Sequence, residues 1–374
     1  MIARKLEILV KSHLSAGKAV IVIGARQVGK TTLLKSISEK WRNKVLFINC
    51  DEPDMRTLLF NKTSTELKAL IGNHTLVIID EAQRVKNIGL SLKLILDQLT
   101  SVQLIVSGSS ALELANEINE PLTGRKWEFI MYPLSMAELI EHNSFLEENR
   151  LLTTRLIYGM YPDVVNNPGS EKSILKNLTD SYLYKDLFSF KDVRKPEVIE
   201  KILQALSLQI GSEVSYNEIA DLVKSDPQTV SRYIDLLEKT MVVYRLPSFS
   251  RNLRNELKKS RKIYFYDNGV RNAIIANFQP AELRKDIGSL WENFILTERL
   301  KFTSYTNLWS NKFFWRTKQQ QEIDYIEERD GKLYTFEFKW GTVKKEKAPT
   351  TFTNAYPESE HRVITPHNYQ PFIS

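Results

Sequence analysis

Residues 24–31 read Gly-Ala-Arg-Gln-Val-Gly-Lys-Thr. This stretch has the spacing GxxxxGK(S/T), it follows the apolar run Ala19–Ile23, and it opens a helical pattern at Leu33. A strand, a glycine-bearing loop and a helix in this order form an anion-binding hollow from backbone N–H groups and the positive helix end. Lys30 would reach the terminal phosphates of a nucleotide, and the Thr31 hydroxyl would ligate Mg²⁺. The residues predicted to bind the nucleotide are Gly24, Gln27, Val28, Gly29, Lys30, Thr31 and Thr32.

The composition fits a multidomain protein. The chain has 374 residues, of which 42% are apolar, which is enough for two or three buried cores. Its net charge of +7 permits an anionic partner without requiring one. Cys50 is the only cysteine, so no intrachain disulfide can form, and no Cys/His spacing is typical of zinc. Because no apolar run reaches the ~18 residues of a membrane span, we expect a cytoplasmic protein without a membrane partner.

Four more apolar runs of strand length follow the phosphate-binding loop. Helical or loop segments separate them, as in a parallel sheet that helices cover on both faces. Ligands of such sheets lie beyond the carboxyl ends of the strands, so the residues after each run are candidates for the site. The five expected strands are Ala19–Ile23, Val45–Asn49, Leu76–Asp80, Gln103–Ser107 and Trp127–Met131.

Polar residues stand at the ends of the third and fourth runs. Beside a phosphate-binding loop, Asp80 would hold Mg²⁺ through water and Glu81 would polarise the attacking water. The alternative is a solvated helix start, where the helix dipole favours carboxylates. Ser107 ends the fourth run, and Ser109 and Ser110 follow it. These hydroxyls are placed either to sense a phosphate or to cap the next helix.

Arg125 directly precedes the fifth run. In ring-forming ATPases a trans-acting arginine commonly lies ahead of that strand and faces the nucleotide of the neighbouring subunit, where it raises the rate by several orders of magnitude. The alternative is a surface arginine that pairs with Glu128 or Asp97. The catalytic candidates are therefore Lys30, Glu81, Ser107 and Arg125.

The middle of the chain predicts two helical parts. Residues 141–195 read as a mostly helical lid, with Arg155 and Arg194 as candidates for a lid arginine. Residues 196–267 predict a winged helix, because two helices, a third helix capped by Asp226 and an apolar strand follow one another. Such a module contacts DNA or docks a protein, and the basic segment that follows favours DNA. The candidate DNA contacts are Gln228, Thr229, Ser231, Arg232, Arg251, Arg254, Lys258 and Lys259.

A hairpin is predicted near the end of the chain. Asp330-Gly331 is the preferred two-residue turn, so residue 329 pairs with 332 and the pairing continues outward. Asp324 then lies opposite Glu337, and carboxylates about 5 Å apart repel unless a cation lies between them. Mg²⁺ or Mn²⁺ suits such oxygen ligands, and Lys339 on the same face would stabilise a developing charge.

Several motifs together resemble the bacterial and archaeal AAA+ ATPases that carry a C-terminal domain of uncharacterised function. They are GARQVGKTTLL, LVIIDEAQ, IVSGSSALEL, LTGR followed by MYPLSMAEL, YGMYPDVV and SYLYKDL. The resemblance covers essentially the whole chain. It implies an AAA+ core, a winged helix and a restriction-endonuclease-like module at the end.

Asp324, Glu337 and Lys339 resemble the PD-(D/E)xK nuclease signature, with Glu292 as the acid often found on a helix of that fold. Ile323 stands where that pattern commonly has proline. Either these residues bind a metal, or the site is inert. In an inert site Lys339 would pair with Glu322, and Asp324 would pair with a base such as Arg316.

The combined expectation is an α/β protein that hydrolyses ATP with Mg²⁺ and remodels DNA, with branched or junction DNA as a candidate form. It would assemble as a homo-oligomeric ring, with a hexamer as one candidate. The alternatives are an ATP-regulated, metal-dependent DNA nuclease and a slow ATPase switch that docks a protein partner. The expected domains are an AAA+ P-loop core with a five-stranded parallel sheet (1–140), a helical lid (141–195), a winged helix (196–267) and a C-terminal α/β nuclease-like domain (268–374).

Overall fold

The chain folds into two compact units. The first comprises Met1–Leu134 with the short segment Lys239–Met241, and the second comprises Ser135–Glu238 and Val242–Ser374. No helix in the described part of the chain is long and apolar enough to cross a membrane. The computed structural model describes residues 1–14, 17–39, 41, 44–108, 118, 121–184 (181 and 182 without side chains), 187, 193, 195–250, 261–317, 319–341 and 347–374.

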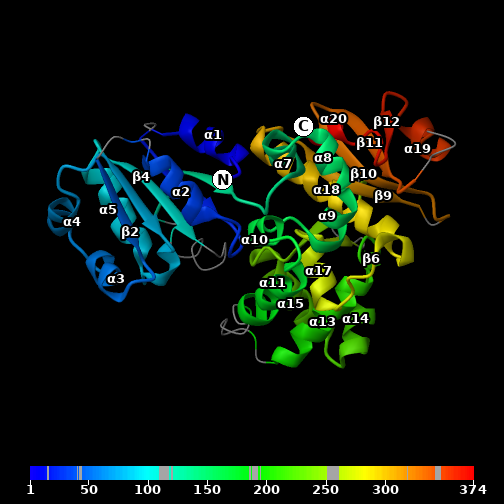
Figure 1. Ribbon diagram of the computed structural model, residues 1–374, viewed down its shortest axis with the longest axis horizontal. Coiled ribbons are helices and arrows are strands. Elements are labelled where there is room, and N and C mark those ends of the chain that lie inside the picture. Colours follow the sequence, from blue (N-terminus) through cyan, green and yellow to red (C-terminus); the bar gives the residue numbers. More distant parts are fainter. Residues whose placement is uncertain are drawn as a thin grey trace. The chain divides into compact units, whose positions relative to one another are not determined.

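A five-stranded parallel sheet forms the centre of the first unit (Figure 1). Its order is β2-β3-β4-β1-β5, so β1 lies between β4 and β5. Every residue of β1, β3 and β4 is buried, as expected for a parallel sheet covered on both faces. The five predicted strands are confirmed, with bounds β1 (Ala19–Ile23), β2 (Val45–Asn49), β3 (Leu76–Asp80), β4 (Gln103–Gly108) and β5 (Lys126–Ile130).

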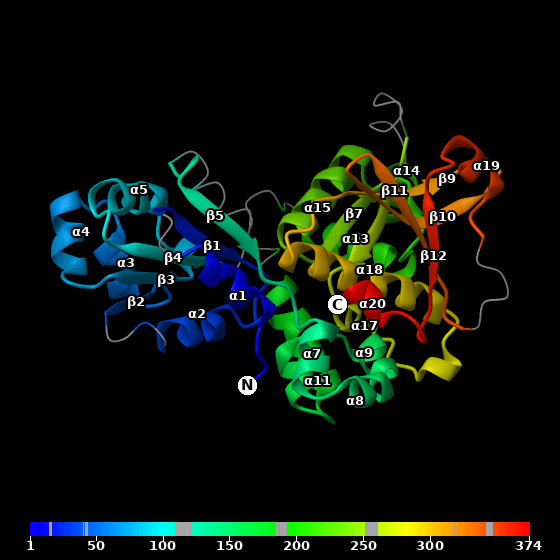
Figure 2. The same cartoon turned by 90° about the horizontal axis from the view of Figure 1, so that it is seen from above.

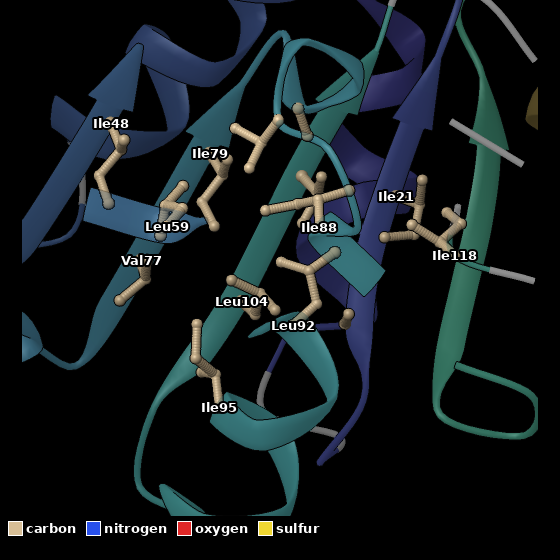
Figure 3. Packing of buried hydrophobic residues seen from close by; sticks show 14 of the residues in the cluster. Ile21, Ile48, Leu59, Val77, Ile79, Ile88, Leu92, Ile95, Leu104 and Ile118 are labelled. Carbon is tan, nitrogen blue, oxygen red and sulfur yellow. The ribbon is translucent and has the colours of Figure 1, made fainter. Parts of the chain in front are cut away.

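Helices enclose this sheet. On one face, Ile21, Ile79 and Leu104 of the strands pack with Leu92 and Ile95 of a helix (Figure 3). Each such side chain contributes about 1.5–3 kcal/mol when it is fully buried. The helices of this unit are α1 (Lys5–Ser12), α2 (Lys30–Glu39), α3 (Pro53–Leu59), α4 (Ser64–Ile71) and α5 (Ile88–Gln98).

The second unit begins with short helices. The described part of residues 141–195, expected as a lid, packs within this unit, where α9 contacts both α17 and α18. The expected domain boundaries at 195 and 267 stay a prediction. The elements are α7 (Met136–His142), α8 (Phe145–Arg150), α9 (Leu152–Tyr158), α10 (Pro162–Asn166), α11 (Glu171–Asn177), α17 (Asn268–Ile274) and α18 (Ile287–Tyr305), with a π-helical stretch at Leu178–Leu183.

Buried polar bonds explain why the helical segment belongs to this unit. Asn268 Nδ2 donates to the carbonyl of Leu156 at 3.1 Å, and the amide of Met160 donates to Asp267 Oδ2 at 2.6 Å. Two segments of the chain approach closely at Gly159. A Cβ at this position would lie 2.1 Å from an oxygen of Asp267. Each of these hydrogen bonds would be exchanged for one to water if the segment moved away, at a net cost of about 0.5–1.5 kcal/mol per bond.

The described residues 196–250 and 261–265 follow the order helix, short strand, helix, helix and two strands. The strands form an antiparallel sheet in the order β6-β8-β7. Asp226 caps the third helix as predicted, because its Oδ1 accepts the amide of Thr229 at 2.8 Å. The winged-helix assignment itself stays a prediction. The elements are α13 (Pro196–Leu208), β6 (Glu213–Val214), α14 (Tyr216–Val223), α15 (Pro227–Lys239), β7 (Val243–Pro247) and β8 (Arg261–Phe265).

A second, four-stranded sheet lies near the C-terminus, in the order β12-β11-β10-β9, with α18 packed against it (Figure 2). The predicted hairpin register is confirmed, since Arg329 pairs with Lys332. Asp330 and Gly331 have φ of 49° and 80°, as this turn requires. The elements are β9 (Asn311–Arg316), β10 (Glu322–Arg329), β11 (Lys332–Phe338), α19 (Thr350–Ala355), β12 (Glu360–Ile364) and α20 (Gln370–Ile373).

Candidate functional sites

The sheet order of the first unit brings three strand ends together. β3, β4 and β1 are neighbours, so Asp80 and Ser107 lie beside the loop that follows β1. Thr31 Oγ1 donates to Asp80 Oδ2 at 2.6 Å, and Ser107 Oγ donates to Asp80 Oδ1. Asp80 is only 2% exposed. Both of these partners are neutral hydroxyls, so they orient the Asp80 carboxylate without cancelling its charge.

Lys30 and Glu81 lie close to each other at this edge of the sheet. The buried Lys30 ammonium donates to the carbonyls of Gly24 and Ala25, each at 2.9 Å, and lies 4.0 Å from Glu81 Oε1. Glu81 has φ 54° and ψ 42°, a left-handed conformation that costs about 1–2 kcal/mol for a residue other than glycine. Gln83 Nε2 donates to Glu81 Oε2 at 2.6 Å and so orients its carboxylate. Such strain is typical of functional sites.

The loop itself is closely packed. A Cβ at Gly24 would lie 2.4 Å from the carbonyl oxygen of Met131, so this position requires glycine. Gly29 and Gln27 have φ of 100° and 62°. Val28 is buried, while Thr32 is exposed on α2. Successive amides in such conformations form the concave donor surface of a phosphate site.

Sequence reasoning missed Arg4. Its guanidinium is buried and donates to the carbonyl of Val28 at 2.6 Å and to the carbonyl of Tyr132 at 2.7 Å. It therefore fixes the loop to the residues that follow β5. No local pattern marks this arginine, because its partners lie 24 and 128 residues away along the chain.

The expected C-terminal site residues lie on α18, β10 and β11. Glu292 Oε1 accepts hydrogen bonds from Lys262 Nζ at 3.0 Å and from Tyr264 Oη at 2.6 Å. Burial raises the pKa of Glu292 to about 7, although the positive charge of Lys262 lowers it in part. Asp324 Oδ2 accepts the amide of Phe338 at 2.8 Å.

The ion pairs of this cluster differ from both expected arrangements. Lys339 Nζ lies 3.6 Å from Glu337 Oε2. Glu322 has two partners: its Oε1 lies 2.5 Å from Lys262 Nζ, and its Oε2 lies 3.6 Å from Arg316 Nε. Burial raises the pKa of Glu337, the Lys339 charge lowers it, and Asp324 raises it. Within the residues that the structure describes, no group of three or more His, Cys, Asp or Glu side chains is placed to hold a metal ion. The divalent ion expected at Asp324 and Glu337 stays a prediction, and the cluster also contains Lys262, a lysine that sequence reasoning did not assign to it.

Comparison with known proteins supports the interpretation of the loop. Residues 16–140 match the family model described as an AAA domain. The chain carries an AAA domain. Residues 149–281 match a domain of unknown function (DUF8612), and residues 287–373 match another (DUF4143). The AAA domain is followed by a C-terminal α/β region, as the sequence predicted.

The similar proteins are themselves uncharacterised. One from Mycobacterium tuberculosis is 26% identical, and the match covers 86% of this chain and 70% of the relative. One from Methanocaldococcus jannaschii is 23% identical, with 87% and 76% covered. A solved structure, "Structure of Drosophila ORC bound to AT-rich DNA and Cdc6", matches 71% of this chain and 90% of its own chain at 12% identity. Its TM-score of 0.26 is too low to support an inference.

Arg125 lies on the surface of the AAA domain. Its Nε is 2.9 Å from Asp97 Oδ1, and the two side chains are 45% and 34% exposed. This is one of the two surface pairs that the sequence allowed. An exposed pair of this kind contributes about 0–1 kcal/mol, so it restrains Arg125 only weakly.

The helix expected to contact DNA presents a mixed surface. Gln228 and Arg232 are exposed, whereas Thr229 and Ser231 are half-buried. The Thr229 hydroxyl donates to Asp226 within the helix cap. The lid candidate Arg155 pairs with the buried Glu148 at 3.0 Å inside the second unit. The candidates Ser109, Ser110, Arg194, Arg251, Arg254, Lys258 and Lys259 lie outside the described residues.

Proposed function

We propose that this protein hydrolyses ATP in its AAA domain and uses the hydrolysis to remodel DNA as a homo-oligomer. The observation that carries the proposal is the chain of hydrogen bonds from Thr31 through Asp80 to Ser107, formed where three strands of the AAA sheet end. It fixes the carboxylate that we propose to bind Mg²⁺ beside the loop that carries Lys30, whose ammonium lies 4.0 Å from a second carboxylate, Glu81. These are the parts that phosphoryl transfer to water requires.

Each residue has a defined role in this proposal. Lys30, which donates to two loop carbonyls, would exchange them for phosphate oxygens, which are stronger acceptors because they are charged. Thr31 and Asp80 would hold Mg²⁺, which supplies charge neutralisation of the phosphates when it is bound. Glu81, oriented by Gln83, would accept a proton from the attacking water.

Arg125 motivates the oligomer. We propose that it leaves Asp97 and supplies positive charge to the nucleotide of a neighbouring copy, in a ring for which a hexamer is one candidate. Because the exposed ion pair of Arg125 with Asp97 contributes only about 0–1 kcal/mol, breaking it requires little free energy. A protein that works in this way hydrolyses ATP faster as its own concentration rises through the range of assembly.

The DNA part of the proposal rests on the exposed Gln228 and Arg232 of α15 and on the net charge of +7. The test is steady-state ATP hydrolysis without DNA and with linear duplex, single strand and a four-way junction, with Glu81→Gln as the inactive control. Stimulation by one form supports DNA remodelling and identifies the preferred structure. Equal turnover with all four samples would contradict it.

A second candidate is a slow ATPase switch that docks a protein partner. The observation that favours it is acidic charge on α15, where Asp235 and Glu238 both pair with Arg245 and remain partly exposed. Carboxylates at this position repel phosphates. This candidate predicts an ATP turnover that DNA leaves unchanged, and DNA binding too weak to show a steep dependence on salt.

A further inference from the structure

The carboxylates of the C-terminal cluster enclose a buried lysine. Lys262 lies on β8, Glu322 and Asp324 on β10, and Glu292 on α18. The Lys262 side chain is 2% exposed, and its Nζ lies 3.0 Å from Glu292 Oε1 and 2.5 Å from Glu322 Oε1. The ammonium group of Lys262, on β8 of the three-stranded sheet, therefore connects α18 with β10 of the four-stranded sheet.

This ammonium remains charged. Burial alone lowers the pKa of Lys262, but the negative charges of Glu292, Asp324 and Glu322 outweigh burial and raise it above its ordinary value. A lysine has three donors, and two of them are directed to carboxylate oxygens here. The repulsion among Glu292, Glu322 and Asp324 is thus relieved without a metal, whereas Glu337 pairs with Lys339.

A divalent ion does not fit beside this group. Glu292 and Glu322 already pair with Lys262, and an ion at Asp324 would be repelled by the positive charge of the nearby ammonium. Asp324 Oδ2 accepts the amide of Phe338, which fixes the position of this carboxylate near the ammonium. To bind a metal among these carboxylates, the protein would have to move the Lys262 side chain into solvent. That movement would break its ion pairs with Glu292 and Glu322.

We propose that Lys262 takes the place of a divalent cation in this cluster, so that the C-terminal region is held together by an ammonium group and does not cleave nucleic acid. The proposal is independent of ATP hydrolysis by the AAA domain. It also gives the lysine a second effect, because β8 of the three-stranded sheet is tied through it to β10 and α18. The whole of this region would then act as a rigid binding module.

The test is Mn²⁺ binding to the full chain without nucleotide, measured by isothermal titration calorimetry. The wild type should show no binding that depends on Asp324. Lys262→Ala frees Glu292, Glu322 and Asp324, so we expect it to bind Mn²⁺ at least tenfold more tightly than the wild type. Asp324→Asn in the same background should remove that gain. Lys332→Ala is the matched control, because Lys332 also pairs with a glutamate, Glu360, at an exposed position.

Several results would overturn the proposal. Wild-type Mn²⁺ binding that Asp324→Asn abolishes would show that the metal and the lysine coexist. Failure of Lys262→Ala to gain binding would show that the carboxylates are not held for a cation. If Lys262→Ala does not fold, Lys262→Gln keeps a hydrogen-bond donor without the charge and should give the same gain.

A nuclease assay gives an independent readout. Wild-type protein with Mg²⁺ or Mn²⁺ should leave duplex, single-stranded and branched DNA intact. Cleavage that is lost in Asp324→Asn would refute the proposal. Because ATP turnover is measured separately with Glu81→Gln, failure of this proposal and failure of the proposed ATPase give different results.

Discussion

Removal of the Ser107 hydroxyl tests the proposed catalytic geometry most directly. Ser107→Ala deletes the donor to Asp80 Oδ1 and the acceptor that lies 3.3 Å from the amide of Glu81. Thr31 still holds Asp80 Oδ2 at 2.6 Å, so the carboxylate keeps one of these two contacts. We therefore expect ATP affinity to change by less than about threefold, because Lys30 and the loop amides are not altered.

The expected loss is in turnover. A hydrogen bond to a charged group contributes about 1.5–3 kcal/mol. If that energy serves to orient Asp80 and Glu81 in the transition state, Ser107→Ala lowers kcat by about ten- to a hundredfold, since each 1.36 kcal/mol corresponds to a factor of ten. An effect on kcat with little effect on KM is typical of an interaction that matters only in the transition state.

A matched control separates this effect from a general loss of packing. Ser91 is another buried serine of the first unit, and its hydroxyl donates to the carbonyl of Leu59 at 2.6 Å. Ser91→Ala should destabilise the fold to a similar degree and leave kcat within about twofold. Steady-state kinetics and equilibrium binding of a fluorescent ATP analogue measure both quantities. Equal losses of kcat in the two variants, or a Ser107→Ala defect confined to binding, would refute the reasoning.

Three further predictions concern other parts of the molecule. Glu292→Gln should flatten the pH dependence of the free energy of unfolding. With a pKa of about 7 for Glu292, the folded protein keeps this proton at a pH where the unfolded chain has lost it. Raising the pH from 6 to 8 should therefore lower the free energy of unfolding of the wild type by about 1 kcal/mol. Urea unfolding of both proteins at the two pH values measures the difference, and an equal pH effect in the variant contradicts it. Arg125→Ala should lower ATP turnover at least a hundredfold in the assembled protein. Asp97→Ala removes only the partner of Arg125 and should leave turnover high. Equal rates in the two variants would exclude a role of Arg125 at the nucleotide of a neighbouring copy. Gly159→Ala should destabilise the second unit by more than about 2 kcal/mol, because its Cβ would meet a carboxylate oxygen at 2.1 Å. Gly169 also has a positive φ, but a Cβ there would meet no atom within 4 Å. In urea unfolding, Gly169→Ala should therefore lower stability only by the cost of the left-handed backbone conformation.

The sequence predicted those elements whose stability is local or repeats along the chain. β1, β2 and β3 begin and end at the predicted residues because each is a short apolar run bounded by polar residues or glycine, and β1 and β3 are buried throughout. The C-terminal hairpin register followed from the turn Asp330-Gly331 alone, since only residues that tolerate positive φ fit that turn. In both cases the determining interactions lie within a few residues.

The packing partners of the helices could not be predicted in this way. The pattern of residues 141–195 shows that one face of each helix is buried, but it does not show against which surface. The surface is chosen by Asn268 and Asp267, whose side chains bond to backbone groups more than a hundred residues away. Arg4 and Lys262 were missed for the same reason, because each acts on partners that only the folded chain brings near.

The two carboxylate clusters of this protein show how the partners of an aspartate decide its chemistry. Asp80 is held by the hydroxyls of Thr31 and Ser107, and neutral donors fix its position while leaving its negative charge available to a divalent ion. Asp324 lies in a cluster whose charge a buried ammonium already offsets. Exchanging the partners should therefore exchange the behaviour: replacing Lys262 with a neutral residue should create an affinity for Mn²⁺ where none existed. A positive charge introduced by Ser107→Lys should conversely abolish ATP hydrolysis by satisfying Asp80 internally, and nucleotide-dependent turnover that survives this change would show that the charge of Asp80 is not what the site uses.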